Sequence, residues 1–238
     1  MALKIPADLN ETFVNRHAEI DPTTGAPVAD PVFDGLANAV RLAREQAGML
    51  ANLEKAAMAD KTMTPEANVV RVASAASKTG ERVAAQLDVA RTRAMAEIAN
   101  IEKRTSSPPP PKDSVALSIE SDITRALASM GDKERADAIA QAKAQGDETV
   151  IAAILRRPAM VSGLGEAQLE GIRHAYRQHF HSADYARLQR LQRAVEAMEK
   201  SGRLFVGIIK SAMDTPFARQ AAIAAREADA AAAHASGA

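Results

Sequence analysis

One uninterrupted stretch of the sequence, residues 64–104, constrains the fold more than any other. Small and apolar side chains recur along it at steps of three or four residues, a spacing that places them on one face of an α-helix. The positions on this face are Val69, Ala73, Ala76, Gly80, Val83, Leu87, Ala90, Ala94, Ile98 and Ile101. Thr64 is a favourable N-cap, and Pro65 suits the first helical position. At roughly 1.5 Å per residue such a helix is about 60 Å long, so it requires packing partners along its length.

A second helix is predicted upstream, beginning at the N-cap Asp30 and at Pro31. Its apolar face consists of Phe33, Leu36, Val40, Ala43, Ala47, Leu50 and Ala57. Only residues 60–63 connect it to the helix of residues 64–104. Because the connection is so short, the two helices should fold back antiparallel. Residues 31–104 are therefore predicted to form a long helical hairpin.

The seam of this hairpin is rich in Ala, Val and Gly. Small side chains permit close approach of helices but bury little apolar area each. We therefore expect the hairpin to pack against either the C-terminal half of the chain or other copies of the chain. The residues predicted to make this interaction are Phe33, Val69, Ala76, Gly80, Val83 and Leu87. The substitution Gly80→Leu is expected to be harmful although it raises helix propensity, whereas the same change at Arg82 should do little.

Four further segments complete the predicted domain organisation. Prolines and turn residues in residues 1–30 predict an extended N-terminal arm, which either is loosely tethered or docks on a neighbouring subunit. Four consecutive prolines in residues 105–113 cannot continue a helix and predict a hinge, which is either a semi-rigid spacer or a ligand for an aromatic groove. Residues 114–215 are predicted to form a C-terminal helical domain, and residues 216–238 an Ala-rich tail.

Composition supports an all-α fold. Together with the helical spacing, it predicts a long antiparallel helical hairpin followed by a bundle of shorter helices. Ala is abundant and aromatic residues are only 3% of the chain, which favours helix over sheet. The absence of Cys excludes disulfides and thiolate metal sites. Lys and Arg number 30, as do Asp and Glu, so no overall charge attracts nucleic acid or an anionic membrane. No apolar run approaches membrane-spanning length, and we expect a soluble protein.

The sequence predicts no catalytic, cofactor-binding or metal-binding residue. His174, His179 and His181, together with Asp184, form the only cluster of possible metal ligands. A zinc site requires three or four converging ligands, and the compact spacing that would bring these side chains together on a helix is absent. We therefore expect ordinary surface histidines.

Residues 156–203 are locally basic, with nine Lys and Arg against five Asp and Glu. Arg187, Arg190 and Arg193 repeat along one predicted helix, and aromatic residues lie near them. A phosphate-binding surface is one interpretation. A solvated helix face, or an interface with an acidic neighbour, is the favoured one because nucleic-acid footprints are usually more basic.

Residues 152–173, with the sequence Ala-Ala-Ile-Leu-Arg-Arg-Pro-Ala-Met-Val-Ser-Gly-Leu-Gly-Glu-Ala-Gln-Leu-Glu-Gly-Ile-Arg, resemble a segment of helical proteins of tailed phages and prophages that are encoded among virion genes. In those proteins an acidic or polar residue usually follows the Ser-Gly-Leu, whereas this chain has Gly165 and Glu166 there. The resemblance covers residues 137–210 at most and includes no catalytic motif.

The resemblance and the helical pattern together predict a non-enzymatic structural or assembly protein, a phage virion component that acts in multiple copies. Its expected partners are other copies of itself and other virion proteins. Its expected location is the virion, or the cytoplasm of the bacterial host during assembly. The alternative is a nucleic-acid-associated helical protein that uses its basic C-terminal helices.

Overall fold

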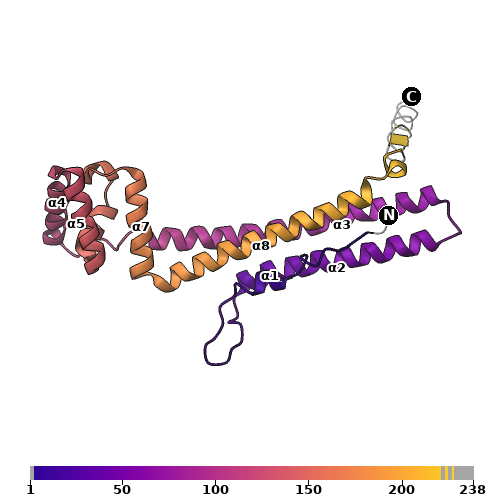
Figure 1. Cartoon of the computed structure of the whole chain (residues 1–238), viewed down its shortest axis with the longest axis horizontal. Coiled ribbons are helices and arrows are strands. Elements are labelled where there is room, and N and C mark those ends of the chain that lie inside the picture. Colours follow the sequence, from indigo (N-terminus) through magenta and orange to yellow (C-terminus); the bar gives the residue numbers. More distant parts are fainter. Residues whose placement is uncertain (1–2, 221–222, 225–226, 228–238) are drawn as a thin grey trace. The chain divides into compact units, whose positions relative to one another are not determined.

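The computed structural model describes residues 3–220, 223–224 and 227, and it confirms the all-α fold (Figure 1). Across these residues the chain forms α-helices and one short 3-10 helix, and the only β pairing is an isolated bridge between Ile20 and Pro27. The chain divides into two compact units. Unit 1 comprises Met1–Met95 and Leu191–Ala238, and unit 2 comprises Ala96–Arg190.

The predicted hairpin is formed by α2 (Pro31–Ala59) and α3 (Pro65–Thr105). Two hydrogen bonds show that the helices are antiparallel, because residues further along α3 bond to residues nearer the start of α2. Near the turn, Asn68 Nδ2 donates to the Asp60 carbonyl oxygen over 3.1 Å. Further along, Arg82 donates to the side-chain oxygen of Gln46. All seven apolar positions predicted for α2 are buried.

The helix ends follow the predicted capping. The Asp30 carboxylate accepts from Val32 N at 2.9 Å, with Pro31 in the first turn. Thr64 Oγ1 accepts from Ala67 N at 3.2 Å and so caps α3. Each cap satisfies a backbone N–H that has no partner within the helix.

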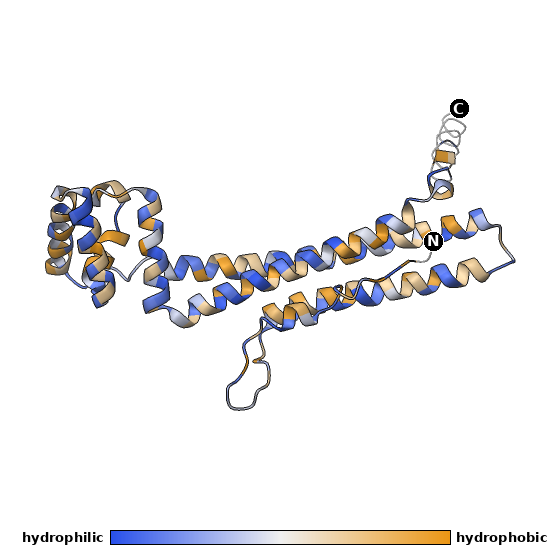
Figure 2. Cartoon of the chain, viewed as in Figure 1, coloured by the Kyte–Doolittle hydropathy of each residue, from blue (hydrophilic) through white to orange (hydrophobic). Residues whose placement is uncertain are grey.

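The third long helix of unit 1 is the C-terminal part of α8 (Ser182–Met213), which runs antiparallel to α3. Arg91 pairs with Glu199 at 2.7 Å, Leu87 lies beside Gly202, and Gly80 lies beside Ile209, so residue numbers fall on α3 as they rise on α8. Both helices are amphipathic, with hydrophobic residues recurring among hydrophilic ones (Figure 2). Residues 191–213 therefore pack with the hairpin, whereas the sequence assigned them to a C-terminal domain of residues 114–215. The small seam of the hairpin explains this difference, because it leaves room for the larger side chains of α8.

The N-terminal residues pack on their own chain. They include the one-turn helix α1 (Thr12–Asn15), and Leu9 and Val14 are both fully buried. The Glu11 carboxylate accepts from Arg44 of α2 at 2.7 Å. Residues 1–30 are thus anchored on their own chain through Leu9 and Val14, whereas Ile20 and Val28 are exposed.

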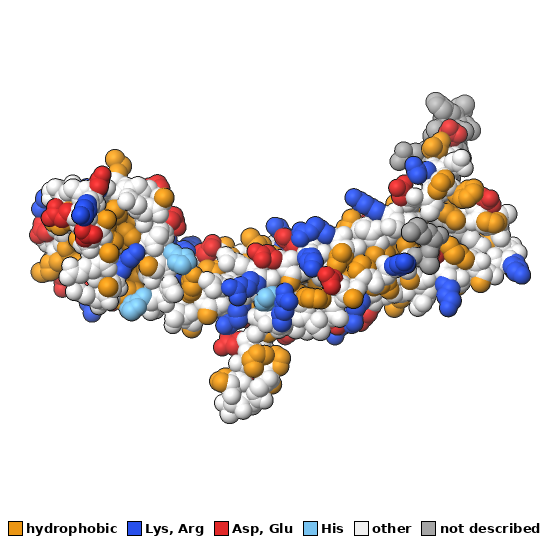
Figure 3. All heavy atoms as spheres, viewed as in Figure 1, with side chains coloured by type: hydrophobic (Ala, Val, Ile, Leu, Met, Phe, Trp, Pro, Cys, Tyr) orange, Lys and Arg blue, Asp and Glu red, His pale blue; other side chains and the backbone are white. Residues whose placement is uncertain are grey.

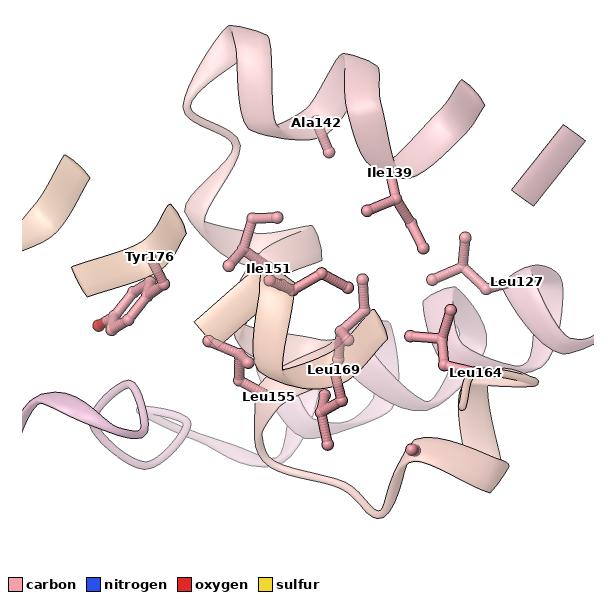
Figure 4. Close-up of a cluster of buried hydrophobic side chains, with 11 residues drawn as sticks. Leu127, Ile139, Ala142, Ile151, Leu155, Leu164, Leu169 and Tyr176 are labelled. Atoms are coloured by element: carbon pink, nitrogen blue, oxygen red, sulfur yellow. The ribbon is translucent and has the colours of Figure 1, made fainter. Parts of the chain in front are cut away.

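Unit 2 is a small bundle with its own hydrophobic core (Figure 4). Its complete helices are α4 (Ser114–Ser129), α5 (Asp132–Gln145), α6 (Glu148–Leu155), the 3-10 helix η1 (Ala159–Ser162) and α7 (Glu166–Phe180). The strongly apolar α6 lies at its centre, and Ile151, Ile154 and Leu155 are buried. Gly146 ends α5 in the left-handed conformation that glycine adopts without strain, and Asp147 then caps α6.

The proline run of residues 105–113 connects α3 to α4 within unit 2 and does not mark the division between the units. Pro108 is buried, and the carbonyl oxygen of Pro109 accepts a hydrogen bond from Arg156. The units divide instead within the long helices α3 and α8.

Only part of the predicted tail, residues 216–238, lies among the described residues. A further helical segment begins at Pro216, where Thr215 Oγ1 accepts from Ala218 N at 3.1 Å. Phe217 is 45% exposed and Ala218 is buried.

Candidate interaction surfaces

The small face of α3 is occupied by α8 of the same chain. Ala76 and Val83 are completely buried, and Leu87 lies 3.6 Å from the position that a Cβ on Gly202 would take. A Cβ on Gly80 would lie 3.2 Å from Ile209 Cγ2. The hairpin was predicted to pack against either the C-terminal half of the chain or other copies of the chain, and in the structure it packs against the C-terminal half. The predicted residues Ala76, Gly80, Val83 and Leu87 serve the interior of unit 1 and do not form a surface for other copies.

Two other predicted interaction residues differ in their exposure. Phe33 is only 4% exposed and belongs to the buried face of α2. Val69 is half-buried and lines a pocket at the end of the hairpin, which is described below.

Two of the three basic residues predicted on α8, Arg187 and Arg190, interact within the chain. Arg187 pairs with Glu97 of α3, and Arg190 is half-buried and interacts within the chain. Arg193 is exposed, and its charge adds to burial and to Arg16 in lowering the pKa of His17. Of the three arginines, Arg187 and Arg190 are therefore already used in contacts within the chain, and Arg193 faces solvent.

The acidic partner of a fourth arginine has a perturbed pKa. Arg104 donates to both carboxylate oxygens of Asp184, at 2.5 and 3.3 Å. This hydrogen bonding, and then the positive charge of Arg104, lower the pKa of Asp184 below its ordinary value. The contact ties the C-terminal end of α3 to the start of α8 within unit 2.

The remaining basic side chains of unit 2 also stabilise the fold. Arg156 pairs with the buried Glu120, and Arg157 donates to Ser121 Oγ at 2.6 Å. Arg177 donates to a backbone carbonyl oxygen, that of Glu102, at 3.3 Å. The local excess of positive charge in residues 156–203 is thus largely used in contacts between helices.

The histidine cluster does not converge. His174 Nε2 lies 2.6 Å from the Tyr185 hydroxyl, while His179 stacks edge-on against Phe180. Within the described part of the chain, no group of three or more His, Cys, Asp or Glu side chains is placed to hold a metal ion.

A pocket of about 650 Å³ lies at the end of unit 1 where α2 turns into α3, and the sequence did not predict it. Its apolar lining comes from all three long helices of unit 1 and from the segment after α8. The main apolar lining residues are Ala57, Met58, Met63, Val69, Val72, Ala212 and Phe217. Hydrophobic side chains are visible on the surface of this end of the unit (Figure 3). Met58 is 62% exposed and Met63 is 44% exposed, so the rim offers flexible, polarisable side chains to a partner.

The two carboxylates of the pocket, Glu54 and Asp60, accept hydrogen bonds from backbone N–H groups. Glu54 Oε2 accepts from Leu3 N at 2.6 Å, and Asp60 Oδ1 accepts from both the N–H and the hydroxyl of Thr62, at 2.8 and 2.5 Å. The hydrogen bonds from Thr62 lower the pKa of Asp60. Both carboxylates thus accept hydrogen bonds from the backbone.

One polar group of the pocket lacks a partner. Asn68 is 6% exposed, and its Nδ2 donates to the Asp60 carbonyl oxygen, which fixes the orientation of the amide. The opposite end, Asn68 Oδ1, is buried and accepts no hydrogen bond from the described residues. The sequence does indicate that Asn68 faces the interior, because it lies four residues before Val72 and eight before Ala76 on one helix. A search for apolar residues at helical spacing passes over it because its side chain is polar.

Comparisons of the chain with protein-family models, with curated proteins and with solved structures found no match. Among the described residues, no helix combines the length and the apolar character that crossing a membrane requires.

Proposed function

We propose that the chain is a non-enzymatic structural or assembly protein that binds a partner protein through the end of unit 1. The observation that carries this proposal is the pocket of about 650 Å³, which has the size of a ligand site and an apolar lining. Exposed apolar surface of this kind is typical of protein interaction sites. Its carboxylates, Glu54 and Asp60, are engaged with the backbone, which favours binding over acid–base chemistry.

We place this role in a phage virion, or in the bacterial cytoplasm during virion assembly. The support is the resemblance of residues 152–173 to helical proteins encoded among virion genes. In the structure this segment supplies the second half of α6, all of η1 and the first half of α7, so it forms much of the core of unit 2. Other virion proteins are the expected partners.

Action in multiple copies remains part of the proposal, but it rests on different residues from those predicted. The seam around Gly80 is filled by Ile209 of the same chain. Contacts between copies would therefore use exposed apolar residues. On α4 these include Val115, which is 65% exposed, and Ile119, which is 48% exposed.

Nucleic-acid association, the alternative function, has less support because Arg187 and Arg190 already interact within the chain. Binding driven by phosphate contacts would weaken steeply with salt. A salt-dependent affinity for DNA that is lost when Arg187, Arg190 and Arg193 are neutralised together would favour the alternative.

Mass spectrometry of phage particles purified from the strain that encodes the chain tests the proposed function. We expect the chain in the particles at a fixed copy number, co-migrating with capsid proteins through a density gradient. A chain that is abundant in the lysate and absent from both mature particles and assembly intermediates would contradict the proposal.

A further inference from the structure

A short β-hairpin formed by residues 19–28 projects from unit 1 just before α2 (Figure 1). We infer that this projecting hairpin docks into a groove between α2 and α3 of a second copy of the chain. The inference rests on the proposed function, because it names a contact through which several copies would act together. The hydrogen bonds, the exposed apolar face and the charge of the projecting hairpin support it, as does an open groove of matching character.

Backbone hydrogen bonds hold the projecting hairpin in one conformation before it meets a partner. Val28 N donates to the Glu19 carbonyl oxygen at 2.8 Å. Asp21 N donates to the Ala26 carbonyl oxygen at 2.9 Å. Within the turn, Gly25 has a φ of 67°, which glycine adopts without strain. Because the segment is already ordered, docking it costs little conformational entropy.

One face of the projecting hairpin is apolar and exposed. Ile20 and Pro27 pair across the two strands, so their side chains lie on the same face. Ile20 is 52% exposed, and Val28, on the opposite face, is 44% exposed. Hydrophobic side chains are visible on this projection in Figure 3. Pro27 has no N–H to offer along the strand edge, which favours recognition through side chains over the addition of another strand.

The groove that matches this face lies between α2 and α3 in unit 1. Its volume is about 270 Å³, and its apolar lining includes Val32, Ala39, Leu42, Val89 and Ala90. The groove is open at Gly35, because no atom lies within 4 Å of the position that a Cβ there would take. Small and aliphatic walls of this kind suit an aliphatic side chain such as that of Ile20.

The charges of the projecting hairpin and the groove are complementary. Glu19 and Asp21 are the charged residues of the hairpin, and residues 18–29 contain no Lys or Arg. Arg93 is the one charged residue that lines the groove. It is exposed, and it forms no ion pair with any residue that the structure describes. Opposite charges that meet in this way favour the contact and fix its register.

A second copy offers this groove in a position that two chains can exchange. The projecting hairpin ends at residue 28, and the groove begins at Val32 in the first turn of α2. The hairpin leaves the groove of its own chain open, because Ile20 is exposed and Val89 is 59% exposed. A two-fold arrangement of two copies would place each hairpin in the groove of the other, so that every contact is made twice.

Cross-linking of engineered cysteines tests this contact, because the chain has no Cys of its own. Ala26→Cys places a thiol on the hairpin and keeps Ile20, and Val89→Cys places one in the groove. The two purified full-length variants are mixed and treated with a short bismaleimide, and mass spectrometry identifies the linked peptides. Docking raises the effective concentration of the two thiols, so we expect at least about tenfold more linkage than in a mixture of Ala26→Cys with Met49→Cys.

Met49 is the matched control position, since it lies on α2, is 61% exposed and does not line the groove. Equal linkage of residue 26 to residues 89 and 49 would overturn the inference.

Two leucine variants separate docking from folding. Gly35→Leu fills the groove and should leave unit 1 folded, because a Cβ there meets no atom within 4 Å. Gly171→Leu is its control, since that helical glycine is equally open and lies in unit 2. Adding Gly35→Leu to the Val89→Cys chain should lower the linkage roughly tenfold, because it prevents burial of an aliphatic side chain. Gly171→Leu should leave the linkage unchanged, and equal effects of the two variants would overturn the inference.

Arg93→Glu tests the match of charges. It places a third acidic group beside those of the projecting hairpin, so it should lower the linkage at low salt and have less effect at high salt, where charges are screened. Undiminished linkage at low salt would overturn the charge match by which this groove was chosen.

A chain that carries both Ala26→Cys and Val89→Cys reports which copy supplies the groove. We expect its links to join two chains, and links confined to single chains would overturn the assignment to a second copy. Links from residue 26 to a different virion protein, with none to residue 89, would also overturn it. The cross-linking uses the purified chain, so its failure is distinguishable from a failure of incorporation into particles, which tests the proposed function.

Discussion

Replacing Gly80 with leucine tests the packing of unit 1, because helix propensity and packing predict opposite signs. Leucine in the interior of a helix is favoured over glycine by roughly 0.8 kcal/mol. Against this gain, even a Cβ at position 80 would lie 3.2 Å from Ile209 Cγ2 and 3.6 Å from its Cγ1. Ile209 is 9% exposed, and β-branched side chains in helices have one strongly preferred χ1 rotamer, so it has little freedom to move.

The remaining atoms of the leucine would overpack this contact, which typically costs about 1–3 kcal/mol. We therefore expect Gly80→Leu to lower the free energy of unfolding of unit 1 by about 0.2–2.2 kcal/mol, the difference between the two effects. Hydrogen exchange of the α3 amides is the appropriate assay, since it reports the local stability of unit 1 rather than a global transition of both units.

Gly207 in α8 is the matched control, because a Cβ there meets no atom within 4 Å. Gly207→Ala should stabilise the unit by about 0.5–1 kcal/mol. It is a cleaner control than Arg82, which donates a hydrogen bond to Gln46 across the hairpin. Stronger protection of α3 in Gly80→Leu than in the unmodified chain would refute the packing of α8 against this face.

Three further predictions concern unit 2. Arg104 lowers the pKa of Asp184, so the pair stabilises the fold above the unfolded carboxyl pKa and loses this contribution as the pH falls through the lower folded pKa. Asp184→Asn should therefore cost about 0.2–1 kcal/mol at neutral pH and nothing once the carboxyl is protonated in both the folded and the unfolded state. Midpoints of urea unfolding measured across an acid titration would show this. Glu120 is 5% exposed and paired with Arg156, so Arg156→Met, which leaves a buried charge unpaired, should cost about 3–5 kcal/mol in urea unfolding. Adding Glu120→Leu to this variant should recover part of the lost stability. No recovery would mean that Arg156 acts through other contacts. Asp147 accepts from two backbone N–H groups at the start of α6, so Asp147→Ala should cost about 1 kcal/mol by the same measurement, and an unchanged midpoint would show that the cap is dispensable.

The sequence predicts the helices of this protein well because their signals are local. The N-caps at Asp30 and Thr64, and the buried positions from Phe33 to Ala57, follow from spacing and capping chemistry alone. The small residues around Gly80 also predict the close helix approach that the structure has there.

What the sequence did not predict depends on contacts between distant residues. The partner of the seam is residues 191–213, more than 100 positions downstream, and periodicity does not specify which of two amphipathic helices pair. The pocket escaped prediction for the same reason, since α2, α3 and the segment around Phe217 meet there. Arg187 and Arg190 look like part of a basic surface in the sequence because their interactions within the folded chain are not visible there.

Incorporation of two charge variants into phage particles tests the central claim most directly, namely that the end of unit 1 binds a partner during assembly. Met58 and Met49 lie on the same helix and are 62% and 61% exposed, but only Met58 lines the pocket. Because both side chains face solvent, lysine at either position should change the free energy of unfolding by no more than about 0.5 kcal/mol. Docking would bury the new charge at position 58 at a high desolvation cost. We predict that Met58→Lys is lost from purified particles while Met49→Lys is incorporated like the unmodified chain; equal incorporation of both variants would contradict the account.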